Sequence, residues 1–177
     1  SRSIERLEIA KKQITNEYPN TNIICLTMDL SDLDSVIKCV NDIKNKNLDI
    51  DYVFNNAGIY RLPYSKTKQG IDLTIGTNYV GTYVFVKELL PYLKSLSHRV
   101  NIAFTTSVSV SATHLDIDTL FNEKEISSVV AYARSKIAII HLYKYLSETN
   151  TDSNIHYYLT HPGSTYTKLI SKAYRNK

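Results

Sequence analysis

Glycine is scarce in this chain, which has only five glycines in 177 residues. A glycine-rich turn that leads into a helix N-terminus is the usual cradle for a dinucleotide pyrophosphate, because glycine lets backbone amides approach the phosphates closely. The five glycines are scattered, and none precedes Gly58. The sequence therefore cannot supply such a cradle ahead of its first helix.

Cysteine and histidine are also too few and too scattered to suggest a metal site. The two cysteines, Cys25 and Cys39, lack the close spacing of zinc or redox motifs. The five histidines show no pair at the helical spacing of metal ligands. We predict no metal, and we expect both thiols to be buried and reduced.

Long apolar runs and one-sided charge are absent as well. Stretches such as 84–86 and 137–140 are far shorter than the roughly 20 residues that cross a bilayer. The net charge is +4, and the basic residues are interleaved with acidic ones, so nucleic-acid binding has little support. We expect a cytoplasmic protein with no membrane span in this segment, and membrane attachment through a terminus outside it stays open.

Helical and strand patterns alternate along the chain. Apolar spacing predicts helices over residues 4–18, 31–46 and 71–96 and a further helix that bears Tyr132 and Lys136, with Ser31 beginning the second and Pro91 bending the third. Short apolar runs predict strands at 22–28, 50–54, 100–105 and 155–159. This alternation predicts an α/β fold, a Rossmann-type doubly wound parallel sheet with right-handed crossovers. Residues 1–177 form one domain.

Tyr132 and Lys136 stand four residues apart in a helix-patterned stretch, so their side chains project from one face. A phenol with a pKa of about 10 shuttles protons poorly near neutral pH. A neighbouring ammonium is expected to lower that pKa. The hydroxyl of Ser107, just after the strand at 100–105, can hold a carbonyl oxygen while the tyrosine donates its proton.

The tyrosine–lysine spacing alone is weak support, because the chain holds 14 tyrosines and the spacing recurs. Two other such pairs, Tyr64 with Lys68 and Tyr83 with Lys87, are most simply solvated or helix-surface residues. The third pair differs in the motifs that accompany it. A hydrolase is a poor alternative, because no Gly-x-Ser-x-Gly turn frames Ser107.

Several motifs, taken in chain order, resemble those of the short-chain dehydrogenase/reductase family. They are Asn55-Asn56-Ala57-Gly58, Asn78-Tyr79-Val80-Gly81, Thr106-Ser107, and Tyr132 with Lys136. The run 115–120 and His161-Pro162-Gly163 with Thr167 resemble the retinol-dehydrogenase-like branch. The family usually has two serines where this chain has Thr106-Ser107, and 164–166 also depart from the branch pattern. Acidic residues at 116, 118, 123 and 125 are expected to lie in a solvated excursion.

The resemblance implies roles for particular residues. The implied catalytic residues are Asn78, Ser107, Tyr132 and Lys136. The implied cofactor-binding residues are Arg2, Asp29, Leu30, Asn56, Ala57, Gly58, Tyr132, Lys136, Pro162, Gly163 and Thr167. Arg2 matches a position that meets a 2′-phosphate, which favours NADP over NAD, although an ordinary charged residue at a frayed end explains it equally well. Asp29 matches an adenine-contacting position, and a helix-entry role is its rival.

The same resemblance implies that the fold is incomplete, without the first two strands and the glycine-rich loop. The strand at 22–28 would then lack the partners that join it to the strand at 50–54, leaving a hole in the sheet. We expect the chain to be a fragment of a longer protein, truncated at both ends.

The implied function is NAD(P)-dependent interconversion of a carbonyl and an alcohol, by hydride transfer with tyrosine acid/base catalysis. The substrate would be small or lipid-like, and a homo-oligomer is compatible with this role. The alternative is a non-catalytic binding or interaction protein built on a truncated scaffold. The missing phosphate loop is the best support for that alternative.

Overall fold

Three parallel strands form the centre of the computed structural model, which describes residues 1–115, 120–121 and 126–163. The strands are β1 (Tyr52–Asn55), β2 (Val100–Thr105) and β3 (Ile155–Thr160), in the order β1-β2-β3. Phe54 pairs with Ala103, which pairs with Tyr158, so the three carboxyl ends meet at one edge. The predicted α/β class and its parallel sheet are confirmed.

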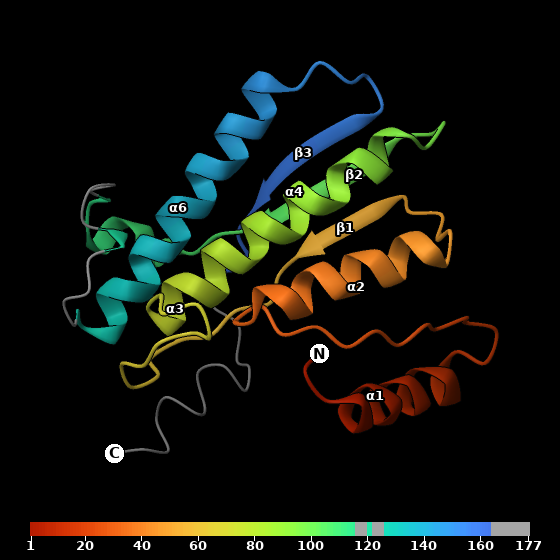
Figure 1. Ribbon diagram of the computed structural model, residues 1–177, viewed down its shortest axis with the longest axis horizontal. Helices are drawn as coiled ribbons and strands as arrows, with labels where there is room; N and C mark the ends of the chain where they lie inside the picture. The colour runs from red at the N-terminus through yellow and green to blue at the C-terminus, as the bar shows by residue number, and fades with distance from the viewer. Residues whose placement is uncertain (116–119, 122–125, 164–177) are drawn as a thin grey trace.

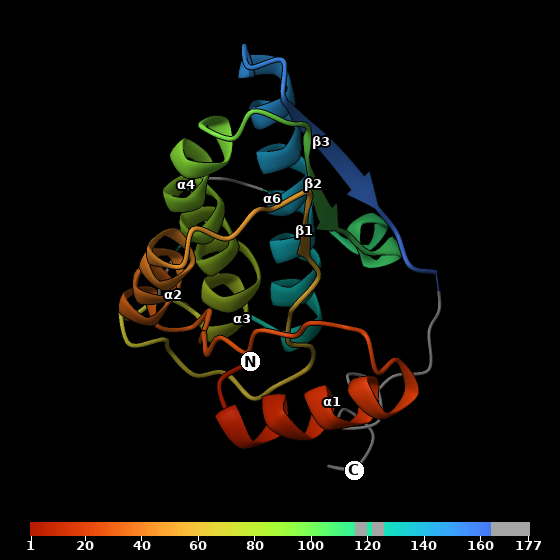
Figure 2. The same ribbon diagram turned by 90° about the vertical axis from the view of Figure 1, so that its right-hand side faces the viewer.

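Three helices cover one face of this sheet, as Figure 2 shows. They are α2 (Leu33–Asn45), α4 (Gly81–Lys94) and α6 (Ser128–Thr149). Their apolar side chains meet strand residues such as Ile102 and Phe104, which are fully buried. Because successive strand residues point to opposite faces, Tyr52 and Phe54 lie on the other face, where they are exposed and stacked 6.0 Å apart.

The predicted helix over 71–96 has three parts. A short α3 (Leu73–Ile75) begins at Asp72, whose carboxylate accepts hydrogen bonds from the backbone of Thr74 and Ile75. A π-helical turn, η1 (Gly76–Val80), follows before α4 begins at Gly81. Single π turns often mark functional positions, and this one carries Asn78.

The N-terminal part of the chain is packed more loosely. Helix α1 (Ile4–Glu17) is capped by Ser3, agrees with the predicted helix and has no buried residue. It lies apart from the sheet at the foot of the molecule (Figure 1). The cap of helix α2 lies one residue later than expected, at Asp32, while the Ser31 hydroxyl donates to the Asp29 carboxylate.

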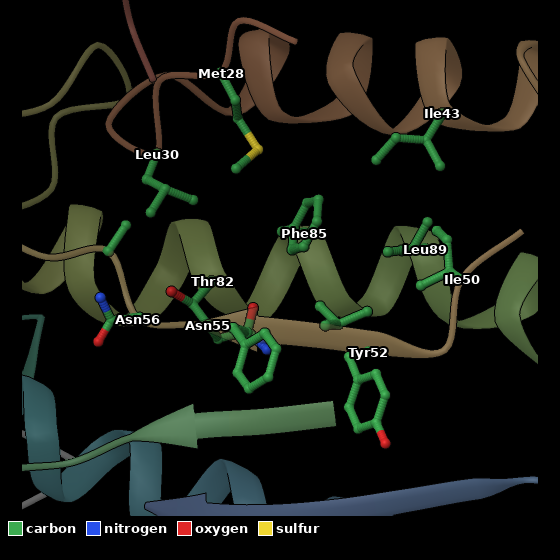
Figure 3. A pocket seen from close by; sticks show the side chains of 13 residues that line it. Met28, Leu30, Ile43, Ile50, Tyr52, Asn55, Asn56, Thr82, Phe85 and Leu89 are labelled. Carbon is green, nitrogen blue, oxygen red and sulfur yellow. The ribbon is translucent and has the colours of Figure 1, made fainter. Parts of the chain in front are cut away.

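The predicted strand at 22–28 is wrong, because the structure assigns these residues to no strand. A strand exists only where a neighbouring strand accepts and donates its backbone hydrogen bonds. Here the Met28 amide donates to the Ser1 carbonyl at 2.9 Å, but no ladder forms. Between this segment and β1 lies a cavity of about 320 Å³ (Figure 3), lined by side chains that include Met28, Leu30, Tyr52 and Phe85. This cavity is the gap in the sheet that was expected.

Within the described residues, no helix is long and apolar enough to span a bilayer. Cys39 is buried, whereas Cys25 is only partly buried, and both are free thiols.

Candidate active site

Tyr132 and Lys136 lie on the buried face of α6, as their spacing predicted. Tyr132 is 9% exposed and Lys136 is 5% exposed. The Lys136 ammonium lies 5.7 Å from the centre of the Tyr132 ring and donates a hydrogen bond of 2.9 Å to the Thr105 carbonyl. This bond ties the helix to the end of β2, so the two residues face the carboxyl edge of the sheet.

Ser107 comes two residues after the end of β2 and caps a short 3-10 helix, η2 (Val108–Ala112). Its side chain lies close enough to the Tyr132 phenol to lower the pKa of that group. The same Ser107 oxygen accepts from the Ser109 amide at 3.3 Å. The turn therefore holds the Ser107 hydroxyl beside the phenol, where the sequence interpretation placed it.

The protonation states of this pair differ from the expectation. Burial raises the pKa of Tyr132, Tyr60 raises it further, and the Ser107 side chain opposes them. Burial lowers the pKa of Lys136 to about 8. The predicted lowering of the Tyr132 pKa by Lys136 is not found, because loss of hydration of the phenolate outweighs other effects and the ammonium points to Thr105.

Asn78 links three parts of the site through its amide. Its Oδ1 accepts from the Ile59 amide at 2.8 Å, and its Nδ2 donates to the Ile59 carbonyl at 3.0 Å and to Ser135 Oγ at 3.1 Å. A methyl group on Gly58 would come within 3.1 Å of Asn78 Oδ1, so this close approach favours glycine. The π turn thereby connects the loop after β1 to helix α6.

Four other predicted cofactor-binding residues follow the carboxyl ends of the two outer strands, β1 and β3. Asn56 and Ala57 follow β1 directly and are exposed, as are Pro162 and Gly163, which follow β3. The Thr106 amide donates to the Thr160 carbonyl at 2.9 Å, which keeps the chain after β3 beside the chain after β2. Thr167 and the acidic residues at 116, 118, 123 and 125 lie outside the described residues.

Arg2, Asp29 and Leu30 lie together next to the start of α4. The Arg2 guanidinium is 3.9 Å from the Asp29 carboxylate, which also accepts from the Ser31 amide at 2.9 Å. A methyl group on Gly81 would come within 2.2 Å of the Leu30 carbonyl oxygen. Gly81 thus lets the turn at 29–31 contact α4 directly. Asp29 also shapes that turn, in agreement with the helix-entry role considered as the alternative.

The comparison with known families agrees with this geometry. A family model described as short chain dehydrogenase matches residues 1–177, the whole chain. The chain belongs to the short chain dehydrogenase family.

Curated relatives of this short chain dehydrogenase include two retinol dehydrogenases. Retinol dehydrogenase 13 of Homo sapiens is 31% identical over 169 residues, which are 95% of this chain and 51% of the relative. Retinol dehydrogenase 11 of Mus musculus is 29% identical over 168 residues, which are 95% of this chain and 53% of the relative. The resemblance to the retinol-dehydrogenase-like branch is confirmed, and the chain spans about half the length of the curated relatives it matches.

Solved structures show the same fold. Levodione reductase has a TM-score of 0.75 and 22% identity, covering 97% of this chain and 63% of its own. A gluconate 5-dehydrogenase from Burkholderia cenocepacia J2315, in complex with NADP and tartrate, has a TM-score of 0.72 and 18% identity, covering 96% and 61%. At these identities the likeness concerns the fold alone, which here is an incomplete Rossmann-type sheet.

The residues at the carboxyl edge fit the sugar-and-ring end of a nicotinamide cofactor. Among the described residues, no carboxylate lies within ion-pair distance of the buried Lys136 ammonium, which leaves donors free to bond hydroxyl groups. Gly58 keeps the space beside Asn78 and Lys136 open. The given residues contain no glycine-rich turn for the phosphates of such a cofactor, because the only glycine before residue 70 is Gly58.

Two residues of the site were missed in the sequence. Ser135, which is fully buried, accepts from Asn78 and donates to the Tyr132 carbonyl at 2.7 Å. A lone serine between Tyr132 and Lys136 in an apolar helix was the signal that could have identified it. Tyr60 contacts Tyr132 from a loop, and no periodic pattern could have revealed that contact.

Proposed function

We propose that this short chain dehydrogenase interconverts a carbonyl and an alcohol by hydride transfer, with Tyr132 as the acid/base. The observation that carries this proposal is the convergence of Tyr132, Ser107 and Lys136 at the carboxyl edge of the sheet. These groups come from one helix and one turn, and the bond from Lys136 to the Thr105 carbonyl holds the helix at the strand end that leads into the turn. Such an arrangement is suited to controlling one proton near one oxygen atom.

The steps follow from the geometry of these side chains. The Ser107 hydroxyl, beside the Tyr132 phenol, donates to the substrate oxygen and orients it. When bound, a reduced nicotinamide supplies the hydride that adds to the carbonyl carbon. As that bond forms, the carbonyl π electrons move onto oxygen, which takes the phenolic proton of Tyr132 and becomes an alcohol. The raised pKa of Tyr132 keeps the phenol protonated at neutral pH, which is the form this reduction needs.

Lys136 and Asn78 support the tyrosine in this scheme. Lys136 would hold the ribose of a nicotinamide nucleotide through its buried ammonium, which lies close to the ring of Tyr132. Asn78 fixes the loop after β1 and the Ser135 hydroxyl, and its helix supports a water-linked path that returns a proton to the phenolate. Gly58 lines the same space.

For the cofactor we propose NADP, with NAD as the alternative. The exposed guanidinium of Arg2 supports this choice, because a cation can bind the 2′-phosphate that NAD lacks, and the gluconate 5-dehydrogenase of the same fold was solved in complex with NADP. The substrate is proposed to be a small or lipid-like carbonyl compound, in line with the names of the retinol dehydrogenases.

A second candidate function is a binding or interaction role without catalysis. It is favoured by the cavity between 28–30 and β1, which could receive a bound group without any chemistry. The two candidates are distinguished by NADPH. The dehydrogenase should bind it saturably and reduce a carbonyl compound with it, whereas a binding protein without catalysis should show no turnover.

The test is a titration of the purified 177-residue chain with NADPH, followed by nucleotide fluorescence and by the melting temperature. Turnover is then measured with a panel of aldehydes and ketones that includes retinal. Tyr132→Phe should abolish turnover and leave NADPH binding nearly unchanged, because it removes only the phenolic hydroxyl. Tyr83→Phe is the matched control, since Tyr83 belongs to a tyrosine–lysine pair of the same spacing on α4. Equal turnover by Tyr132→Phe and the unchanged chain would refute the assignment.

A further inference from the structure

Tyr60 stands next to the reacting tyrosine, although it belongs to the loop after β1. The ring centres of Tyr60 and Tyr132 are 4.6 Å apart, and the ring planes meet at 67°. This is an edge-to-face contact, the arrangement that aromatic pairs prefer. Residues 60 and 132 are thus held in contact across 72 positions of sequence.

The backbone is fixed on both sides of Tyr60. On one side, the Asn78 amide both accepts from and donates to the backbone of Ile59. On the other side, Arg61 has a φ of 52°, in the left-handed region that few residues with side chains adopt. Such a conformation persists only when the surrounding structure enforces it. The direction of the Tyr60 side chain is therefore set by its neighbours in the loop.

We propose that Tyr60 is a positioning residue for Tyr132, which holds the phenol in line with Ser107 and shields that side of the ring from water. This inference rests on the proposed function, in which Tyr132 is the acid/base. It extends the role of Asn78, because the Asn78 bonds to Ile59 place the neighbouring Tyr60 ring. Asn78 thus acts on the acid/base through the loop as well as through Ser135.

The groups that surround Tyr132 make the effect of Tyr60 measurable. Ser107 lies beside the phenol and lowers its pKa, Lys136 lies 5.7 Å from the ring centre, and Tyr60 covers another side. Tyr60 contributes to the raised pKa of Tyr132, after the larger effect of burial. Removing the Tyr60 ring exposes the phenol to water and removes that contribution, so both consequences lower the Tyr132 pKa.

The decisive experiment is a pH titration of chain labelled with 13C at tyrosine Cζ, followed by NMR. The Tyr132 resonance is identified by its loss in Tyr132→Phe. Tyr60→Leu should lower the Tyr132 pKa, and Tyr60→Phe, which keeps the ring, should lower it less.

Tyr145→Leu is the control, because Tyr145 lies on the same helix as Tyr132 and is 61% exposed. If Tyr60→Leu fails to fold, Tyr60→Met replaces it. A Tyr132 titration in Tyr60→Leu that superimposes on that of the unchanged chain would overturn the proposal.

Kinetics give a second readout. Tyr60→Leu should reduce kcat about tenfold or more, since small displacements of a catalytic group are costly, and should leave KM for NADPH nearly unchanged. An unchanged kcat would contradict the positioning role. The NMR titration needs no turnover, so a Tyr132 titration that Tyr60→Leu leaves unchanged overturns the proposal without any kinetic measurement. Turnover by Tyr132→Phe at the original rate would defeat the proposed function, a result separate from the outcome at Tyr60.

Discussion

The sheet region, residues 33–163 as described, and the N-terminal segment, residues 1–30, differ in how they are held in place. Strand and helix residues of the sheet region, such as Phe104 and Leu89, are 1% exposed or less. In the N-terminal segment, α1 buries no residue and Ile9 is 60% exposed. The chain therefore holds the residues of the proposed proton-transfer site in a buried core, whereas the segment that carries the proposed cofactor contacts Arg2, Asp29 and Leu30 is only lightly packed.

The largest expected effect comes from one matched pair of apolar truncations. Leu89→Ala should lower the free energy of unfolding by about 2–5 kcal/mol, because it leaves a cavity among α4, α2 and the sheet. Ile9→Ala should change it by less than about 0.5 kcal/mol, since this side chain is already exposed. Urea denaturation of both variants measures the difference. Equal losses would show that α1 packs as tightly as the core.

The next effect concerns the buried ammonium of the sheet region. The pKa of Lys136 is lowered in the folded chain from 10.5 to about 8, so between these values the unfolded chain binds more protons. The free energy of unfolding should therefore rise with pH across this window, relative to Lys136→Met, by roughly 3 kcal/mol in total. Below pH 8 the Met variant should be the more stable protein.

Denaturation of both proteins at several pH values tests this prediction. The comparison cancels the raised pKa values of Cys39, Tyr132 and Tyr157, which act in the opposite direction at alkaline pH. A difference between the two proteins that stays constant from pH 7 to 10.5 would contradict the burial of a charged Lys136.

A smaller effect is expected where the two regions meet. Gly81→Ala places a methyl group within 2.2 Å of the Leu30 carbonyl oxygen, so backbone must move. We expect a loss of about 1–3 kcal/mol in the free energy of unfolding, together with weaker NADPH binding if 29–30 contact the nucleotide. Gly76→Ala is the control, because its added methyl meets side chains rather than backbone, with Thr67 Cγ2 at 2.3 Å and Ile71 Cβ at 3.7 Å. Comparable losses in both variants would mean that the contact with Leu30 is not special.

The sequence was informative where local pattern decides structure. The strand at 100–105, the start of α1 and the shared face of Tyr132 and Lys136 all follow from residue spacing, and the structure has them. The failed strand at 22–28 had the right composition, but strand formation depends on partners that no local pattern reports. The π turn at Asn78 was also invisible, because one widened turn leaves the helical period of its surroundings nearly intact.

The pKa values of the site residues were harder to predict from the sequence than which residues lie close together. Spacing placed an ammonium near Tyr132 and suggested a lowered pKa, but burial, which depends on the whole fold, reversed the direction. Similarly, Ser31 and Asp32 both suit a helix cap, and only the bond between Ser31 and Asp29 decides between them. Individual roles depend on contacts that are distant in sequence.

The Asn78 bonds to Ile59 also limit which mutations this chain can accept. One planar amide accepts a backbone N–H with its oxygen and donates to a carbonyl and a hydroxyl with its nitrogen. Aspartate keeps the acceptor and loses both donors, leucine loses all three bonds, and glutamine is one methylene too long for a site with 2% exposure. Almost any substitution at position 78 is therefore expected to be damaging, whereas most substitutions on the exposed surface of α1 should be tolerated.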